Sequence, residues 1–165
     1  MSGLVLRPAA PEDVDVLGRV AHDSFHQAFA GIMSPAALAQ RPLPFFIERF
    51  AEQWPHVTAA ATAGRIVGFS LVRQAHIDML FVDPATQARG IGKALLAAAE
   101  AAGARSLECF RDNHEARAFY EKHGWTLNQS LRRTFCGEEY DFVTYARKLE
   151  PAGVIVVTAP SKLIS

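Results

Sequence analysis

The chain has 165 residues, of which 50% are hydrophobic and 21% are charged, and this composition suits one globular domain with a substantial apolar core. Because 17 Lys and Arg residues balance 17 Asp and Glu residues, the charge argues against a nucleic-acid partner. No apolar stretch approaches the length of a membrane span and no secretory leader is evident, so we expect a cytoplasmic protein without a membrane partner.

The first part of the sequence predicts a strand followed by helices. Residues 4–7 form a short apolar strand, and apolar side chains then recur at helical spacing over residues 11–28. Ser34, which precedes a proline, signals a second helix start, whereas Pro42 and Pro44 interrupt the helical pattern before it resumes. We therefore expect one long helix and then a broken helical pair.

The next segment predicts a hairpin and a further strand. Residues 57–61 and 65–73 read as two strands that flank a turn containing Gly64. Residues 76–82 supply another apolar strand. This strand leads directly into a segment with two glycines, which is the position that a phosphate-binding loop between a strand and a helix occupies.

The segment at residues 87–94, with the sequence QARGIGKA, predicts a pyrophosphate cradle. Gly90 and Gly92 lack a Cβ atom, so the backbone can approach a ligand closely and present its N–H groups. The following helix adds the positive end of its dipole and the unpaired N–H groups of its first turn. Arg89 and Lys93 add full positive charges.

Two common phosphate loops do not fit this segment. A nucleoside-triphosphate loop needs a hydroxyl side chain where Ala94 stands, and a dinucleotide fingerprint needs a third glycine where Leu95 stands. The alternative interpretation is a tight strand-to-helix turn whose basic side chains are simply solvated.

A second pattern follows a short strand predicted at residues 106–110. Asp112 and Glu115 resemble the capping box of a helix start, and Gly124 suits the left-handed residue that ends a helix. Within this helix, Tyr120 can bury its ring and still present its hydroxyl to a cleft.

The remaining sequence predicts two final strands. Residues 131–135 and 140–149 flank a turn that contains Cys136 and Gly137. Cys136 and the other cysteine, Cys109, have neither the spacing of metal ligands nor that of a disulfide framework. We therefore expect reduced thiols and no metal site.

Together the elements predict an α/β fold with a mixed, mostly antiparallel central sheet of six to seven strands and about four helices. The domain covers residues 1–149. The C-terminal tail, residues 150–165, contains a β-prone run that suits an extra strand or a strand exchanged in a homodimer, and a disordered tail is the alternative.

The two patterns together resemble the GNAT superfamily of N-acetyltransferases. Gln87, Gly90 and Gly92 match the family's Q/R-x-x-G-x-G/A motif. The segment from Asn113 to Trp125 is similar to the family's N-x-x-A-x-x-F-Y-x-x-x-G-[FW] helix at every fixed position. The resemblance covers roughly residues 3–149.

The resemblance implies an enzyme that moves an acetyl group from acetyl-CoA to a primary amine by direct attack in a ternary complex. Strands 76–82 and 106–110 would splay apart to hold the pantetheine arm, and Tyr120 would protonate the coenzyme A sulfur. With the same fold, a CoA-binding sensor or interaction module with little catalysis is the alternative. The residues implied in cofactor binding are Leu80, Phe81, Val82, Gln87, Ala88, Arg89, Gly90, Ile91, Gly92, Lys93 and Asn113.

The general base is less defined by the sequence. Asp78 and Glu108, on the two strands expected to splay, are the first candidates; the others are His76, Asp23 and His26. Regular alternation would put Asp78 on the same face as Leu80 and Val82, unless a bulge intervenes. For Tyr120 we expect the ordinary pKa of a phenol, about 10.

The acceptor should bind near the broken helical pair, where aromatic side chains concentrate. No compact acidic cluster lies there, which argues against polycationic acceptors and leaves a small amine, an amino-acid derivative or a peptide N-terminus. The side chains that form this expected surface are His26, Phe29, Met33, Phe45, Phe46, Phe50 and Trp54.

Overall fold

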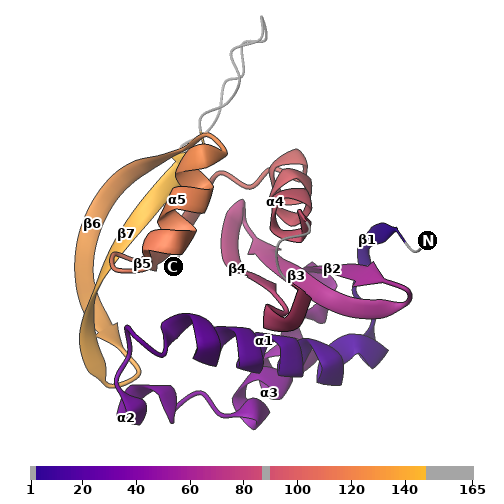
Figure 1. The fold of residues 1–165 in the computed structure, drawn as a ribbon, viewed down its shortest axis with the longest axis horizontal. Helices are drawn as coiled ribbons and strands as arrows, with labels where there is room; N and C mark the ends of the chain where they lie inside the picture. The colour runs from indigo at the N-terminus through magenta and orange to yellow at the C-terminus, as the bar shows by residue number, and fades with distance from the viewer. Residues whose placement is uncertain (1–2, 87–89, 148–165) are drawn as a thin grey trace, which may run out of the picture.

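The computed structural model describes residues 3–86 and 90–147. These residues form one seven-stranded sheet with strand order β1-β2-β3-β4-β5-β7-β6, covered by helices on both faces (Figure 1). The strands are β1 (Leu4–Pro8), β2 (Val57–Thr62), β3 (Arg65–Arg73), β4 (His76–Val82), β5 (Ser106–Phe110), β6 (Trp125–Phe135) and β7 (Glu138–Arg147).

The helices divide between the two faces of the sheet. Leu17 of α1 and Phe46 of α3 belong to the core on one face, whereas Leu95 of α4 and Tyr120 of α5 belong to cores on the other. The predicted α/β fold is thus confirmed, with five α-helices in the described residues where about four were expected. They are α1 (Val14–Phe29), α2 (Pro35–Leu38), α3 (Leu43–Gln53), α4 (Ile91–Ala101) and α5 (His114–Lys122).

All neighbouring strands are antiparallel except β4 and β5, which are parallel. These two strands pair only at their first residues, His76 with Ser106 and Ile77 with Leu107. Beyond these pairs the strands separate (Figure 1). The predicted splay is confirmed, and it opens the sheet between the two helical layers.

Asp78 is the extra residue of a β-bulge. Leu71 of β3 pairs with Met79 and the adjacent Val72 pairs with Ile77, so no β3 residue lies opposite Asp78. Met79 packs in the core below α1 and α3, and the Asp78 side chain approaches Arg49 of α3. The predicted position of Asp78 on the face of Leu80 and Val82 is therefore wrong, because the bulge adds one residue and reverses the alternation.

The start of α5 also differs from the prediction. Asn113 is the N-cap, since its side chain accepts a hydrogen bond from the N–H of Ala116 at 3.2 Å. The expected cap, Asp112, instead pairs with the neighbouring Arg111 at 3.2 Å. At the other end, Gly124 has φ +92° and ends the helix in the left-handed region, as predicted.

The last strand pair is longer than predicted. β6 begins at Trp125 rather than at residue 131. The prediction missed residues 125–130 because the five residues after Trp125 are all exposed and lack the alternation of a half-buried strand. Cys136 and Gly137 both have positive φ and form the two-residue turn between β6 and β7. The predicted tail, residues 150–165, lies outside the described residues.

Two further observations concern residues 3–86 and 90–147 alone. No helix there is both long enough and apolar enough to cross a membrane. The same residues contain no group of three His, Cys, Asp or Glu side chains that could hold a metal ion.

Candidate active site

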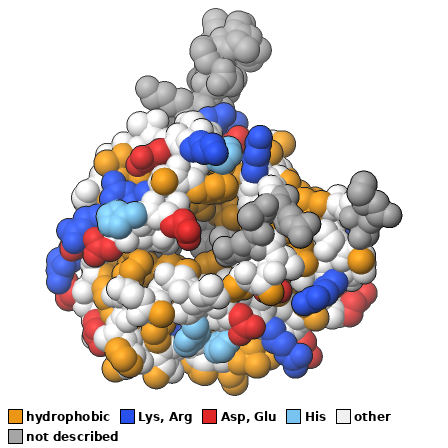
Figure 2. Space-filling model, in the orientation of Figure 1, with side chains coloured by type: hydrophobic (Ala, Val, Ile, Leu, Met, Phe, Trp, Pro, Cys, Tyr) orange, Lys and Arg blue, Asp and Glu red, His pale blue; other side chains and the backbone are white. Residues whose placement is uncertain are grey.

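Two cavities meet where β4 and β5 separate. The first, of about 770 Å³, lies between β4 and the helices α4 and α5, and we call it the cofactor cavity. The second, of about 420 Å³, reaches from the splay to α1, α3 and the β6–β7 hairpin, and we call it the acceptor cavity. Figure 2, in the orientation of Figure 1, shows a hollow in the surface with hydrophobic side chains around it. Residues that line both cavities are Leu80, Phe81, Asn113, Ala116 and Tyr120.

The N-terminus of α4 opens into the cofactor cavity. Gly90 is the N-cap and has φ +72°, a left-handed conformation that favours glycine. No described side chain caps this helix, so the N–H groups of its first turn remain available to a ligand. Of the predicted loop, Gly90 to Lys93 line the cavity, whereas Gln87, Ala88 and Arg89 lie outside the described residues.

Gly92 faces the cofactor cavity, and neither a close contact within the protein nor a positive φ requires glycine at this position. A Cβ atom there would lie 3.5 Å from the Phe119 ring and 3.8 Å from Val82, which are ordinary van der Waals distances. Its φ is not in the left-handed region. The glycine therefore leaves open space in the cavity rather than relieving a clash within the protein.

Basic side chains dominate the charged lining of the cofactor cavity. Lys93 extends from α4, and Lys122 and His123 lie at the end of α5, whereas Glu115 is the acidic residue among the described lining residues. Together with the dipole of α4, these groups make the cavity suited to an anionic ligand.

The backbone of β4 borders the splay. Leu80, Phe81 and Val82 pair with β3 on one side, while no described strand pairs with them on the β5 side. The carbonyl of Val82 accepts a hydrogen bond from the Ser24 hydroxyl of α1 at 3.2 Å. This edge thus presents main-chain groups to whatever occupies the gap between the strands.

Tyr120 lies at the junction of the two cavities. Its ring packs near Trp125 and Tyr145 and its residue is 8% exposed. Burial, with a smaller contribution from Cys109, raises the pKa of the phenol well above its usual value. The expected ordinary pKa is therefore wrong, and the phenol keeps its proton at neutral pH. Among the described residues its hydroxyl has no hydrogen-bond partner.

Cys109 of β5 also lines the acceptor cavity. Burial raises the pKa of its thiol to about 12. The side chain therefore stays a neutral thiol at physiological pH, in which form it is a poor nucleophile. Cys109 and Cys136 are both unpaired, as predicted.

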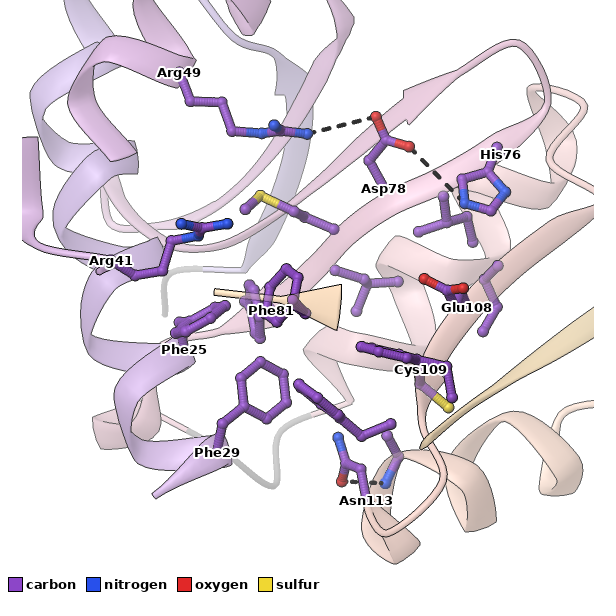
Figure 3. A pocket seen from close by; sticks show the side chains of 18 of the residues that line it. Phe25, Phe29, Arg41, Arg49, His76, Asp78, Phe81, Glu108, Cys109 and Asn113 are labelled. Carbon is purple, nitrogen blue, oxygen red and sulfur yellow. Dashed lines mark hydrogen bonds and ion pairs between the residues drawn. The ribbon is translucent and has the colours of Figure 1, made fainter. Parts of the chain in front are cut away.

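Asp78 lies in the wall of the acceptor cavity, where Figure 3 shows it between Arg49 and His76. It accepts a hydrogen bond from Arg73 Nε at 3.0 Å, and Arg49 Nη2 lies 3.7 Å away. His76 Nε2 lies 4.0 Å from the other carboxylate oxygen. Glu108, the second predicted carboxylate, lies in the same wall and pairs with Arg133.

His76 contacts both Ser106, its partner in the pairing of β4 with β5, and Asp78. Its Nδ1 lies 2.8 Å from the Ser106 hydroxyl of the neighbouring strand. Burial lowers the pKa of the imidazole, while Asp78 and Glu108 oppose this shift and Arg73 adds to it. The structure thus brings His76, Asp78 and Glu108 together in one cavity; the other two sequence candidates, Asp23 and His26, do not line it.

The aromatic surface predicted near the broken helical pair divides in two. Phe29, Phe45 and Phe46 line the acceptor cavity. Met33 and Phe50 are buried in the core and do not line it, and neither do His26 and Trp54. Other side chains that were not predicted also line the cavity. They are Phe135 and Phe142 of the β6–β7 hairpin and four arginines, Arg41, Arg49, Arg73 and Arg133.

Comparison with known proteins agrees with this geometry. Residues 10–132 match the family model described as an acetyltransferase (GNAT) domain. A GCN5-related N-acetyltransferase from Rhodopseudomonas palustris has 31% identity and a TM-score of 0.71, covering 90% of this chain and 98% of that one. No curated protein sequence matches the chain.

Two more distant structures share the fold. The PaiA N-acetyltransferase from Thermoplasma acidophilum, in complex with coenzyme A, has 19% identity and a TM-score of 0.69, covering 88% of this chain and 99% of that one. YncA from Salmonella typhimurium, with acetyl-CoA, has 13% identity and a TM-score of 0.64, covering 92% of this chain and 96% of that one. On the family match and the closer structural relative, the chain belongs to the GNAT family of acetyltransferases.

Proposed function

We propose that this acetyltransferase moves an acetyl group from acetyl-CoA to a primary amine by direct attack in a ternary complex. The observation that carries the proposal is the meeting of two cavities at Tyr120, one basic and adjacent to a helix N-terminus, the other aromatic and lined by carboxylates. A cofactor and an acceptor can enter such a site from opposite sides of the sheet.

Acetyl-CoA is the cosubstrate, with its pyrophosphate at the N-terminus of α4. The uncapped helix and the side chain of Lys93 provide N–H groups and charge for the phosphates. The pantetheine arm follows the unpaired edge of β4 past Leu80 and Val82, with Asn113 on its other side. The complexes of the distant relatives with coenzyme A and acetyl-CoA support this assignment.

In the reaction, the neutral amine attacks the thioester carbonyl and forms the new C–N bond. A main-chain N–H of β4 polarises the carbonyl oxygen. The C–S bond then breaks, and the leaving thiolate takes the proton of the Tyr120 hydroxyl. The amine gives up its proton to Glu108 or Asp78, directly or through water. The carboxyl group then releases this proton to solvent and Tyr120 takes one back, so the reaction leaves an N-acetyl amine, coenzyme A and the unchanged enzyme.

Direct transfer is favoured over an acetylated enzyme by the state of Cys109. This thiol on β5 is the cysteine among the described lining residues, and burial raises its pKa to about 12. It is therefore almost entirely protonated at neutral pH, when a thiolate would be needed to attack the thioester.

The test is acetyl-CoA turnover against a panel of primary amines, with coenzyme A release and the mass of the acetylated product measured together. The proposal expects release that depends on the amine. Tight binding of acetyl-CoA without coenzyme A release in the presence of any amine would favour the CoA-binding sensor instead. A cytoplasmic location and a homodimer remain predictions from the sequence.

A further inference from the structure

The acceptor cavity contains more positive than negative side chains. Four guanidinium groups line it against two carboxylates. The histidine in the same wall, His76, is buried and has a lowered pKa, so it adds no charge at neutral pH. The excess is therefore two positive charges; the charged lining residues are Arg41, Arg49, Arg73, Arg133, Asp78 and Glu108.

Two of the arginines are paired with the two carboxylates. Arg73 donates to Asp78 at 3.0 Å, and Arg133 pairs with Glu108. Arg49 approaches Asp78 only to 3.7 Å, and its Nε atom is buried without a hydrogen-bond partner among the described residues. The described residues thus satisfy only part of the hydrogen-bonding capacity of Arg49.

Arg41, in the short connection between α2 and α3, has no carboxylate partner among the described residues. Its guanidinium lies 4.1 Å from the Phe45 ring centroid and 5.1 Å from that of Phe135. Its one side-chain hydrogen bond goes to the carbonyl of Gln40 at 3.2 Å. The two rings fix the plane of the guanidinium and leave N–H groups along its edge for a ligand.

Figure 3 shows Arg41 and Arg49 reaching toward the same cavity from the helical side, with Phe25, Phe29 and Phe81 nearby. A planar guanidinium matches the two oxygens of a carboxylate. The surrounding phenylalanine rings provide an apolar wall for the rest of the acceptor.

We infer that the acceptor is a small amine with an apolar body and a carboxylate, and that Arg41, with Arg49 beside it, binds the carboxylate. This inference rests on the proposed acetyl transfer, since the amine must lie at the splay near Tyr120. The cavity of about 420 Å³ has room for an acceptor about the size of one amino acid together with the acetyl group.

The experiment compares acceptors with and without the carboxylate, with kcat/KM calculated per neutral amine because the carboxylate also changes the pKa of the amine. The pairs are phenylalanine with 2-phenylethylamine and leucine with 3-methylbutylamine. We expect kcat/KM for the amino acid of each pair to exceed that of its partner by about tenfold or more, as one charge-assisted contact allows. Equal rates, or faster reaction of the amines that lack a carboxylate, would overturn the inference and leave acetyl transfer itself intact.

Arg41→Met tests the residue, because methionine keeps an apolar side chain over the rings and removes the charge. The variant should lose about tenfold or more with phenylalanine and less than about twofold with 2-phenylethylamine. Arg19→Met, at an exposed position of α1 that lines neither cavity, is the matched control and should behave as the wild type with both. Equal losses with both acceptors in Arg41→Met would refute the carboxylate contact.

Calorimetry measures the preference for a carboxylate without requiring turnover. Calorimetry on the CoA-saturated protein should show tighter binding of N-acetylphenylalanine than of N-acetyl-2-phenylethylamine, with the difference lost in Arg41→Met. If none of the four amines is acetylated, the proposed function fails for this panel while the calorimetry still decides whether the cavity selects a carboxylate. The absence of any preference would then reject the inference independently.

Discussion

Ile77 and Leu107 form the last paired residues between the parallel strands β4 and β5. Two residues of pairing hold the strands together, and the rest of both strands is free to border a gap. The cofactor cavity and the acceptor cavity meet in this gap, so Asp78 and Glu108 on the two strands and Tyr120 on α5 line the same cavity.

Tyr120→Phe should lower kcat by about 10²- to 10⁴-fold, which is the range of one general acid. Affinity for coenzyme A should stay within about twofold of wild type, because the ring and its packing are unchanged. Stability should change by less than about 1 kcal/mol, since the hydroxyl makes no hydrogen bond among the described residues.

The matched control is Tyr140→Phe, which also removes a phenol hydroxyl but lines neither cavity. The Tyr140 hydroxyl accepts from the Ser34 N–H at 3.1 Å and donates to Glu138 at 3.1 Å. We therefore expect this control to lose stability and keep its rate per folded molecule. A Tyr120→Phe enzyme with an unchanged kcat would remove Tyr120 from the proton transfer.

Gly92→Glu tests whether the loop binds the cofactor. A Cβ atom at this position meets only ordinary contacts, so the variant should still fold. Affinity for coenzyme A, measured by calorimetry, should fall by about tenfold or more, because the larger, negative side chain occupies space proposed for the pyrophosphate. Gly92→Ala should keep an affinity close to wild type, since alanine also satisfies the Q/R-x-x-G-x-G/A motif. Gly31→Glu, at a glycine with open space and no positive φ, is the control. Wild-type affinity in Gly92→Glu would indicate that the loop is only a structural turn.

Asp78→Asn should reduce kcat/KM more than Glu108→Gln does. Arg133 contacts both oxygens of Glu108, whereas the contacts of Asp78 with Arg73 and Arg49 both fall on Oδ2, so Oδ1 of Asp78 is more available for the proton of the amine. A loss of about 10²-fold or more is expected for the residue that accepts the proton. The check is the pH profile of kcat/KM for each variant. Unchanged profiles in both would leave water as the base.

His76 should make stability depend on pH. Its folded-state pKa is below the usual 6.5 because of burial, so the unfolded state binds more protons as pH falls through this value. The free energy of unfolding should therefore decrease between pH 7 and lower pH. In His76→Asn, which has no titrating group, the decrease should be smaller. Urea denaturation at several pH values measures both proteins, and parallel curves would contradict the assignment.

The framework of the site could be predicted from local patterns. The strand at 76–82 and the strand at 106–110 have the predicted bounds, because each is a short apolar run bounded by breaking residues. The helix that carries Tyr120 ends at Gly124 as expected, since a left-handed residue there favours glycine.

The rest depends on contacts between distant segments. The bulge at Asp78 adds one residue to a strand whose sequence gives no signal of it, and this reverses the face of the side chain. The arginines of the acceptor cavity come from α3, the α2–α3 connection, β3 and β6, so only the folded chain shows that they converge. The pKa of Tyr120 likewise depends on burial that tertiary packing creates.

Direct acetyl transfer to an amine can be tested by rapid-quench mass spectrometry of the protein mixed with acetyl-CoA and an accepted amine. We predict one N-acetyl amine for each coenzyme A released, no coenzyme A release before the amine is added, and no mass increase of the protein. A burst of coenzyme A with an acetylated protein before the amine is added would show an acetyl-enzyme intermediate and exclude direct transfer.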